Sequence, residues 1–144
     1  MDKSTGSTPT DYALDEQVGF LLRRATQRHL AIFARQIPTL TSTQFAALAK
    51  LYQSGPTSQN ALGRATAMDA ATIKGVIDRL RKKGMVASTR DDEDQRRIFV
   101  EITEAGRDLF ERDRSCALAI SADTLSPLSP EEQRQFLALL ARLT

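Results

Sequence analysis

Hydrophobic residues recur at steps of three and four over most of the chain, which is the spacing of helices with one buried face. Residues that cap helices separate these segments: Thr41 with Gln44, and Ser129 with Glu132, form the capping-box pattern. Pro38 ends the first segment. The pattern predicts helices over residues 12–36, 42–54, 57–66, 70–83, 104–120 and 130–143.

Strict alternation of apolar and polar residues, the mark of a half-buried strand, occurs near residue 100. Ile98, Val100 and Ile102 fall on one face of this strand. The segment "MVASTR" at 85–90 predicts its partner, and the charged turn between them is longer than a tight hairpin turn. We therefore expect a two-stranded hairpin whose tip projects into water.

The elements between residues 38 and 103 come in the order helix, short helix, helix and hairpin. This order is typical of a winged helix-turn-helix, in which the second helix of the pair lies in the DNA major groove. The hairpin is then the wing. We predict a mainly α fold with a small β-hairpin wing.

The pattern also divides the chain into parts. Residues 1–11 are polar and predict a disordered tail, and residues 38–103 predict the winged helix-turn-helix DNA-binding domain. Residues 12–37 and 104–144 predict a helical dimerisation region. Its helices carry more apolar surface than a lone winged domain covers, so we expect a homodimer.

Composition excludes several classes of protein. The 144 residues include one cysteine, which excludes a disulfide framework and a cysteine-based metal cluster. No apolar run approaches the roughly 20 residues of a membrane span, and no signal peptide precedes the helices, so a cytoplasmic protein is expected. The sequence shows no nucleophile–base pair, glycine-rich phosphate loop or metal-spaced cluster. We expect neither an enzyme nor a cofactor.

Charge is more informative in its distribution than in its total of +2. Residues 74–97 hold eight basic residues against five acidic ones. Such a patch can attract nucleic acid, although charge alone fits a solvated surface equally well. In the turn, Asp94 can pair with Arg90 or Arg96 and hold a guanidinium outward, toward the minor groove.

Helical geometry selects the residues that face DNA. Ile73, Val76 and Ile77 must face inward, so the opposite side of the first turns of that helix is exposed. Arg79 fits either a phosphate contact or an ion pair within the domain. The predicted DNA-binding residues are Ala70, Ala71, Thr72, Lys74 and Gly75 for the groove, Ser58, Asn60 and Arg64 for phosphates, Arg79 with its two possible roles, and Arg90, Arg96 and Arg97 in the wing.

Three segments resemble the MarR family of bacterial regulators: "LTSTQFAALAKLY", "IDRLRKKGMVASTRDDEDQRRIFVEIT" and "TEAGRDLF". Asp94, Arg96 and "EIT" at 101–103 match the wing pattern of that family. The resemblance implies an obligate homodimer in which the first, fifth and sixth helices interleave. It also implies a palindromic operator and a small anionic or phenolic ligand that weakens DNA binding, hence a ligand-responsive repressor. Gly75 departs from the family, many members of which have arginine or another polar residue there.

His29, the single histidine, lies on the apolar face of the first helix beside Thr26, where a structural role is the commoner one. The resemblance implies that effectors bind between the first helix and the DNA-binding lobe. An imidazole beside arginines suits an aromatic carboxylate. The expected effector-binding residues are His29, Arg23, Arg24, Arg28, Thr26, Phe45 and Tyr52. The segment "QVGFLLRRATQRHLAIF" resembles the family's repressors of nicotinate degradation, which points to hydroxynicotinate.

Two alternatives stay open at this point. Cys116 could make the protein a redox-responsive regulator, although its apolar neighbours favour a packing role. A winged helix can also serve as a protein-interaction module, in which case any binding of DNA would depend little on salt.

Overall fold

The computed structural model describes residues 11–144. The predicted tail, residues 1–11, therefore lies outside the described residues except for Asp11. The first helix, α1, spans Val18–Gln36 and follows a short 3-10 turn, η1, over Leu14–Glu16. It begins later than predicted because Gln17 has an extended backbone, with φ −83° and ψ 137°, and separates the turn from the helix.

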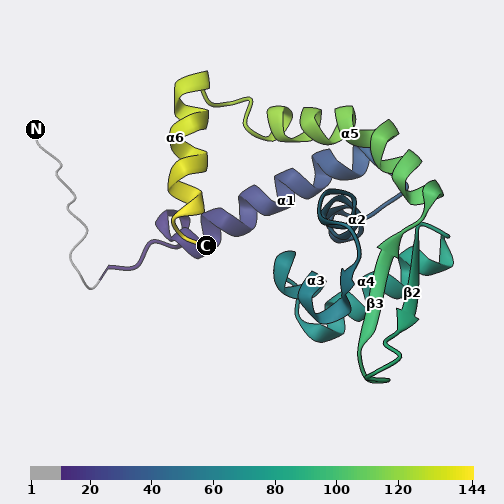
Figure 1. Cartoon of the computed structure of the whole chain (residues 1–144). Helices are drawn as coiled ribbons and strands as arrows, with labels where there is room; N and C mark the ends of the chain where they lie inside the picture. Colours follow the sequence, from purple (N-terminus) through teal and green to yellow (C-terminus); the bar gives the residue numbers. More distant parts are fainter. Residues whose placement is uncertain (1–10) are drawn as a thin grey trace, which may run out of the picture.

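The winged helix-turn-helix lobe is present in the predicted order (Figure 1). Its caps also match: Thr41 and Gln44 exchange the two hydrogen bonds of a capping box, at 3.2 and 3.3 Å, and Asp69 caps the next long helix. The lobe consists of α2 (Ser42–Ser54), β1 (Thr57–Ser58), α3 (Gln59–Ala65), α4 (Ala70–Lys82), β2 (Val86–Arg90) and β3 (Ile98–Ile102).

The hairpin belongs to a three-stranded antiparallel sheet with the order β1-β3-β2. Strand β1 pairs Thr57 with Val100 and Ser58 with Phe99, an addition that the sequence analysis did not predict. Helix α3 accordingly begins at Gln59 rather than at residue 57. A strand of two residues is too short to show alternation, which explains why the pattern concealed it.

One hydrophobic core joins the lobe to the long helices. Val100 in β3 is fully buried, and Ile98 and Ile102 are half-buried on the same face, as predicted. The predicted inner stripe of α4 is buried as well: Ile73, Val76, Ile77 and Leu80. Since each such side chain contributes about 1.5–3 kcal/mol when fully buried, this stripe anchors α4 firmly.

The C-terminal helices are α5 (Glu104–Thr124) and α6 (Pro130–Ala141). Helix α5 packs along α1, and its first turn adjoins the hairpin (Figure 1). Helix α6 stands apart from both and has no buried residue. The capping box of Ser129 and Glu132 starts it, as predicted.

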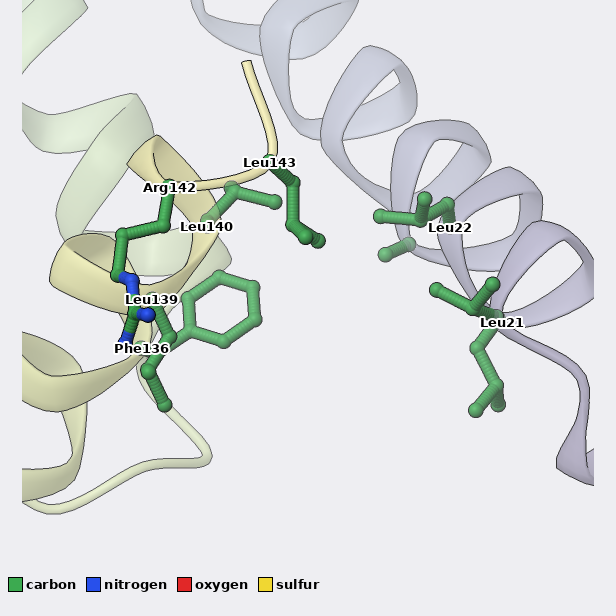
Figure 2. A pocket seen from close by; sticks show the side chains of 9 residues that line it. Leu21, Leu22, Phe136, Leu139, Leu140, Arg142 and Leu143 are labelled. Carbon is green, nitrogen blue, oxygen red and sulfur yellow. The ribbon is translucent and has the colours of Figure 1, made fainter.

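An open gap of about 600 Å³ separates α6 from the first turns of α1. Figure 2 shows Leu21 and Leu22 of α1 on one side of this gap, with Phe136 of α6 and Leu143, just beyond the end of α6, on the other. Its lining is mostly apolar: Val18, Leu21, Leu22, Ala25, Phe136, Leu139, Leu140, Arg142 and Leu143.

Gly106 in α5 allows the closest approach between the helical region and the hairpin. A Cβ at this position would collide with the carbonyl oxygen of Met85 and lie 2.9 Å from Cγ1 of Ile102. We expect Gly106→Ala to lower the free energy of unfolding by about 1–3 kcal/mol, because the packed backbone cannot yield easily. Thermal denaturation measures the effect.

Gly75→Ala is the matched control, since a Cβ there would meet only Nη1 of Arg79, at 3.7 Å. This control should keep or slightly raise the melting temperature, because alanine favours a helix by up to about 1 kcal/mol. Equal melting temperatures for Gly106→Ala and the parent would contradict the packing described.

Candidate nucleic-acid interface and effector cavity

The N-terminal half of α4 presents a small, smooth outer face. Ala70, Ala71, Thr72 and Lys74 are exposed and Gly75 is half-buried. These side chains form a low surface that can approach base edges and thymine methyl groups. The structure thus leaves all five predicted groove residues on one accessible side of the lobe.

Asp69 fixes the start of α4. Its carboxylate accepts the N–H of Thr72 at 2.7 Å, and this backbone hydrogen bond is the main reason why the pKa of Asp69 lies below its usual 3.8. A lowered folded-state pKa means that the cap stabilises the helix above about pH 3.8 and loses this effect as the pH falls further. The beginning of the helix is therefore held in place at neutral pH.

Some basic side chains of α4 form ion pairs within the helix, whereas Arg79 does not. Asp78 binds Lys74 at 3.3 Å and Arg81 at 3.0 Å, and the hydrogen bond from Lys74 is the main cause of the lowered pKa of Asp78. Arg79 is exposed and forms no ion pair with any residue of the described range 11–144. Of its two predicted roles, the phosphate contact is the one that this arrangement favours.

Arg96 extends from the wing with 95% of its side chain exposed. Asp94 contacts both the backbone and the side chain of Arg96. Its Oδ1 accepts the backbone N–H of Arg96 at 3.0 Å and lies 3.6 Å from Nε of the guanidinium. The predicted pairing of these two residues is confirmed. Arg90 does not pair with Asp94 but donates to the carbonyl oxygen of Gln95 at 2.6 Å, across the turn.

The acids of the turn also shape its backbone, a role that the sequence analysis missed. Asp91 accepts the N–H of Glu93 at 3.0 Å, and its own N–H donates to the carbonyl oxygen of Arg97 at 2.8 Å. Such bonds to the residue two positions on are typical of aspartate in turns, and this preference could have revealed them. The guanidinium of Arg97 covers the ring of Phe99, 5.3 Å from its centroid.

A small cleft joins the wing to the start of α3. It brings Asn60 of α3 together with Arg96 and Arg97 of the wing, and it also includes Gln59, which was not predicted. Arg64 is exposed near the end of α3. Ser58 also lines this cleft, although it is largely buried. Its hydroxyl oxygen accepts the N–H of Ala61 at 3.2 Å and so caps α3, a role that was not predicted.

A separate cavity of about 340 Å³ lies between α1, the end of α5 and α6. This place differs from the expected one, since none of the described residues of the DNA-binding lobe lines the cavity. Of the predicted effector residues, His29 and Thr26 line it, and Nδ1 of His29 lies 2.9 Å from Oγ1 of Thr124. Apolar side chains form most of the wall, with hydroxyl groups near the imidazole. The lining residues are Leu22, Ala25, Thr26, His29, Ser121, Thr124, Leu125, Phe136, Leu137 and Leu140.

The structure does not bring all the predicted effector residues to this cavity. Arg28 donates to the carbonyl oxygens of Asp123 at 2.8 Å and Thr124 at 3.4 Å, and so caps the end of α5. Arg23 and Arg24 are exposed on α1 outside the lining. Among residues 11–144 of one protomer, no arginine therefore lines the cavity.

Phe45 and Tyr52 lie elsewhere, because α2 packs against the N-terminal half of α5. Their rings are 5.5 and 4.4 Å from the ring of Phe110, and the hydroxyl of Tyr52 donates to Glu111 at 2.8 Å. Both residues thus connect the lobe to α5 without touching the cavity. Cys116 is half-buried against the hydrophobic core, in agreement with the packing role.

Comparison with known proteins explains this combination of elements. The sequence profile of the MarR family matches residues 40–98. The HTH-type transcriptional repressor NicR of Pseudomonas putida is 43% identical over 150 residues, which cover 99% of this chain and 95% of NicR. The chain belongs to the MarR family. Members of this family and the relatives found are transcriptional regulators rather than enzymes.

Two solved structures share the fold over almost their whole length. A probable transcriptional regulator from Pseudomonas aeruginosa is 50% identical with a TM-score of 0.88, and the match covers 92% of this chain and 100% of that one. BpsR of Bordetella bronchiseptica, whose DNA binding is regulated by 6-hydroxynicotinic acid, is 41% identical with a TM-score of 0.87, covering 92% and 96%. In the described part of the present protein, every helix is too short or too polar to cross a membrane.

We expect Arg96→Ala to weaken DNA binding more than Asp92→Ala. Arg96 points outward from the wing, and losing one phosphate or minor-groove contact should reduce the slope of log affinity against log salt by about one. Both variants can be titrated over a range of salt concentrations with a duplex selected from a random pool by the parent protein. Identical affinity and slope for Arg96→Ala and the parent would contradict this role of the wing.

Proposed function

We propose that this member of the MarR family is a repressor that binds a palindromic operator as a homodimer and is released by a small aromatic acid, with hydroxynicotinate as the candidate. The observation that carries the proposal is the cavity at His29, located at one end of α5 while the wing adjoins the other end. The description of NicR as a repressor and the regulation of BpsR by 6-hydroxynicotinic acid support it.

The exposed face of α4 and the arginines of the wing supply the contacts to DNA. The exposed residues Ala70, Ala71, Thr72 and Lys74, with Gly75, would meet base edges. Asn60, Arg64 and Arg79 would hold phosphates. A two-fold dimer presents two such lobes, and half-sites one helical turn apart then give a palindromic operator.

The apolar gap between α1 and α6 supports the homodimer. Val18 is 63% exposed on α1, Leu139 on α6 is 58% exposed, and Leu143, just beyond α6, is 70% exposed. Large apolar surfaces of this kind mark protein interfaces. A second copy of the chain is the occupant that we propose, because most soluble oligomers are symmetric homo-oligomers.

Helix α5 offers a path from the cavity to the wing. At its start, Thr103 donates its hydroxyl to the carbonyl oxygen of Gly84 at 2.7 Å and its N–H to that of Met85 at 3.0 Å. At its end, Thr124 lines the cavity. A ligand that shifts the end of this single 21-residue helix would therefore reposition the lobe, and the spacing between the two recognition helices would change.

Leu139→Glu should disrupt the homodimer. The leucine is 58% exposed in one protomer, so a charge there would cost little in a monomer but would be buried unpaired in the proposed interface. Light scattering should give about twice the 15.9 kDa chain mass for the parent and for the exposed control Gln135→Glu, and not for Leu139→Glu. A dimeric Leu139→Glu protein would argue against this interface.

His29→Phe should leave DNA binding intact and weaken the response to 6-hydroxynicotinate. A ligand shifts the equilibrium only through its differential affinity for the two forms, and one lost hydrogen bond corresponds to about a tenfold loss of potency. Titrating the protein–DNA complex with the acid measures this response, with the exposed Gln27→Ala as control. An unaltered half-effective concentration in His29→Phe would exclude His29 from the effector site.

A further inference from the structure

The hydroxyl of Thr124 stands between two groups that could both take its hydrogen. Its Oγ1 lies 2.8 Å from the carbonyl oxygen of Ile120, within α5, and 2.9 Å from Nδ1 of His29, on α1. The two helices thus meet at a short chain of hydrogen bonds that runs from the imidazole through the hydroxyl to the backbone.

The single hydroxyl hydrogen of Thr124 decides the direction of these hydrogen bonds. A hydroxyl donates once, whereas a carbonyl oxygen can only accept. If Thr124 donated to His29, its oxygen would face that of Ile120 at 2.8 Å with no hydrogen between them, which is repulsive in a partly buried site. Thr124 therefore donates to Ile120 and accepts the N–H of Nδ1 of His29.

The other ring nitrogen, Nε2, is then the atom available to a ligand. Within residues 11–144 it has no hydrogen-bond partner, and no side-chain nitrogen or oxygen there is both buried and unpaired. Nε2 is thus accessible, on a residue that lines the cavity. In the neutral ring, a hydrogen on Nδ1 leaves Nε2 with a free lone pair.

We propose that Thr124 is a positioning residue that fixes the tautomer of His29, so that Nε2 accepts a hydrogen bond from the effector. The inference rests on the proposed effector role of this cavity. It assigns a ligand class: an aromatic acid that carries a hydrogen-bond donor, either a hydroxyl or a ring N–H, at the position facing His29. The imidazole therefore accepts a hydrogen bond from this donor. It does not bind the carboxylate of the ligand, contrary to what the sequence led us to expect.

Selectivity follows from the unpaired acceptor. A site built to bond a donor rejects the analogue that lacks it, because the acceptor is then buried without a partner. 6-Hydroxynicotinate and nicotinate share a ring and a carboxylate and differ in this donor. We expect the affinity of the cavity for 6-hydroxynicotinate to exceed that for nicotinate by about tenfold or more.

Nitrogen NMR of the 144-residue chain, prepared without a histidine tag, tests the tautomer directly, because His29 is the only histidine in this sequence. At alkaline pH, where an ordinary imidazole is neutral, the parent should show a protonated Nδ1. Thr124→Val keeps the side-chain shape but removes the acceptor, so the hydrogen should move to Nε2. Thr124→Ser should restore the parent spectrum. A parent ring protonated at Nε2, or an unchanged ring in Thr124→Val, would overturn the assignment.

Calorimetry with the two acids tests the consequence. The preference for 6-hydroxynicotinate over nicotinate should fall toward one in Thr124→Val and return in Thr124→Ser, a pattern that a general loss of stability would not produce. An undiminished preference in Thr124→Val refutes the positioning role. If neither acid binds the parent protein, the proposed function fails for this ligand class, while the NMR result still decides whether Thr124 sets the tautomer.

Discussion

The stacking of Phe45 on Phe110 is the contact on which the rest of the arrangement depends. It joins α2 of the DNA-binding lobe to α5, and Phe33 of α1 completes the cluster at 6.0 Å from Phe45. Aromatic pairs of this kind bury large areas and add directional preference to the packing. Because the three helices share one core, the lobe has a fixed orientation relative to the cavity, and a movement of α5 cannot leave α4 unaffected.

The wing shows how acidic residues can serve a surface that meets a polyanion. Asp91 and Asp94 use their carboxylates on backbone N–H groups of the turn, which places the exposed guanidinium of Arg96 at a defined point. The two carboxylates thus face the backbone of the loop, whereas the guanidinium of Arg96 lies at its outer edge. Composition alone, with eight basic residues against five acidic ones between 74 and 97, could not separate these two roles.

The sequence predicted features that depend on local patterns and missed those that depend on distant partners. The inner stripe of α4, both capping boxes and the alternating strand β3 follow from spacing within a few residues. The contact of His29 with Thr124 joins positions 95 residues apart, and no periodicity reports it. The same holds for Arg28, which was expected to bind the effector and instead caps the end of α5. Strand β1 escaped prediction because two residues carry no pattern.

Helix α6, which has no buried residue in one protomer, has a thermodynamic consequence. In the proposed homodimer, the free energy that holds this helix comes from association, so folding of the C-terminal region and binding of a second chain become a single equilibrium. The stability of the protein then depends on how many copies the cell contains. A regulator of this type would couple its own abundance to its resistance to unfolding, since dilution favours the state in which the apolar face of α6 is open to water.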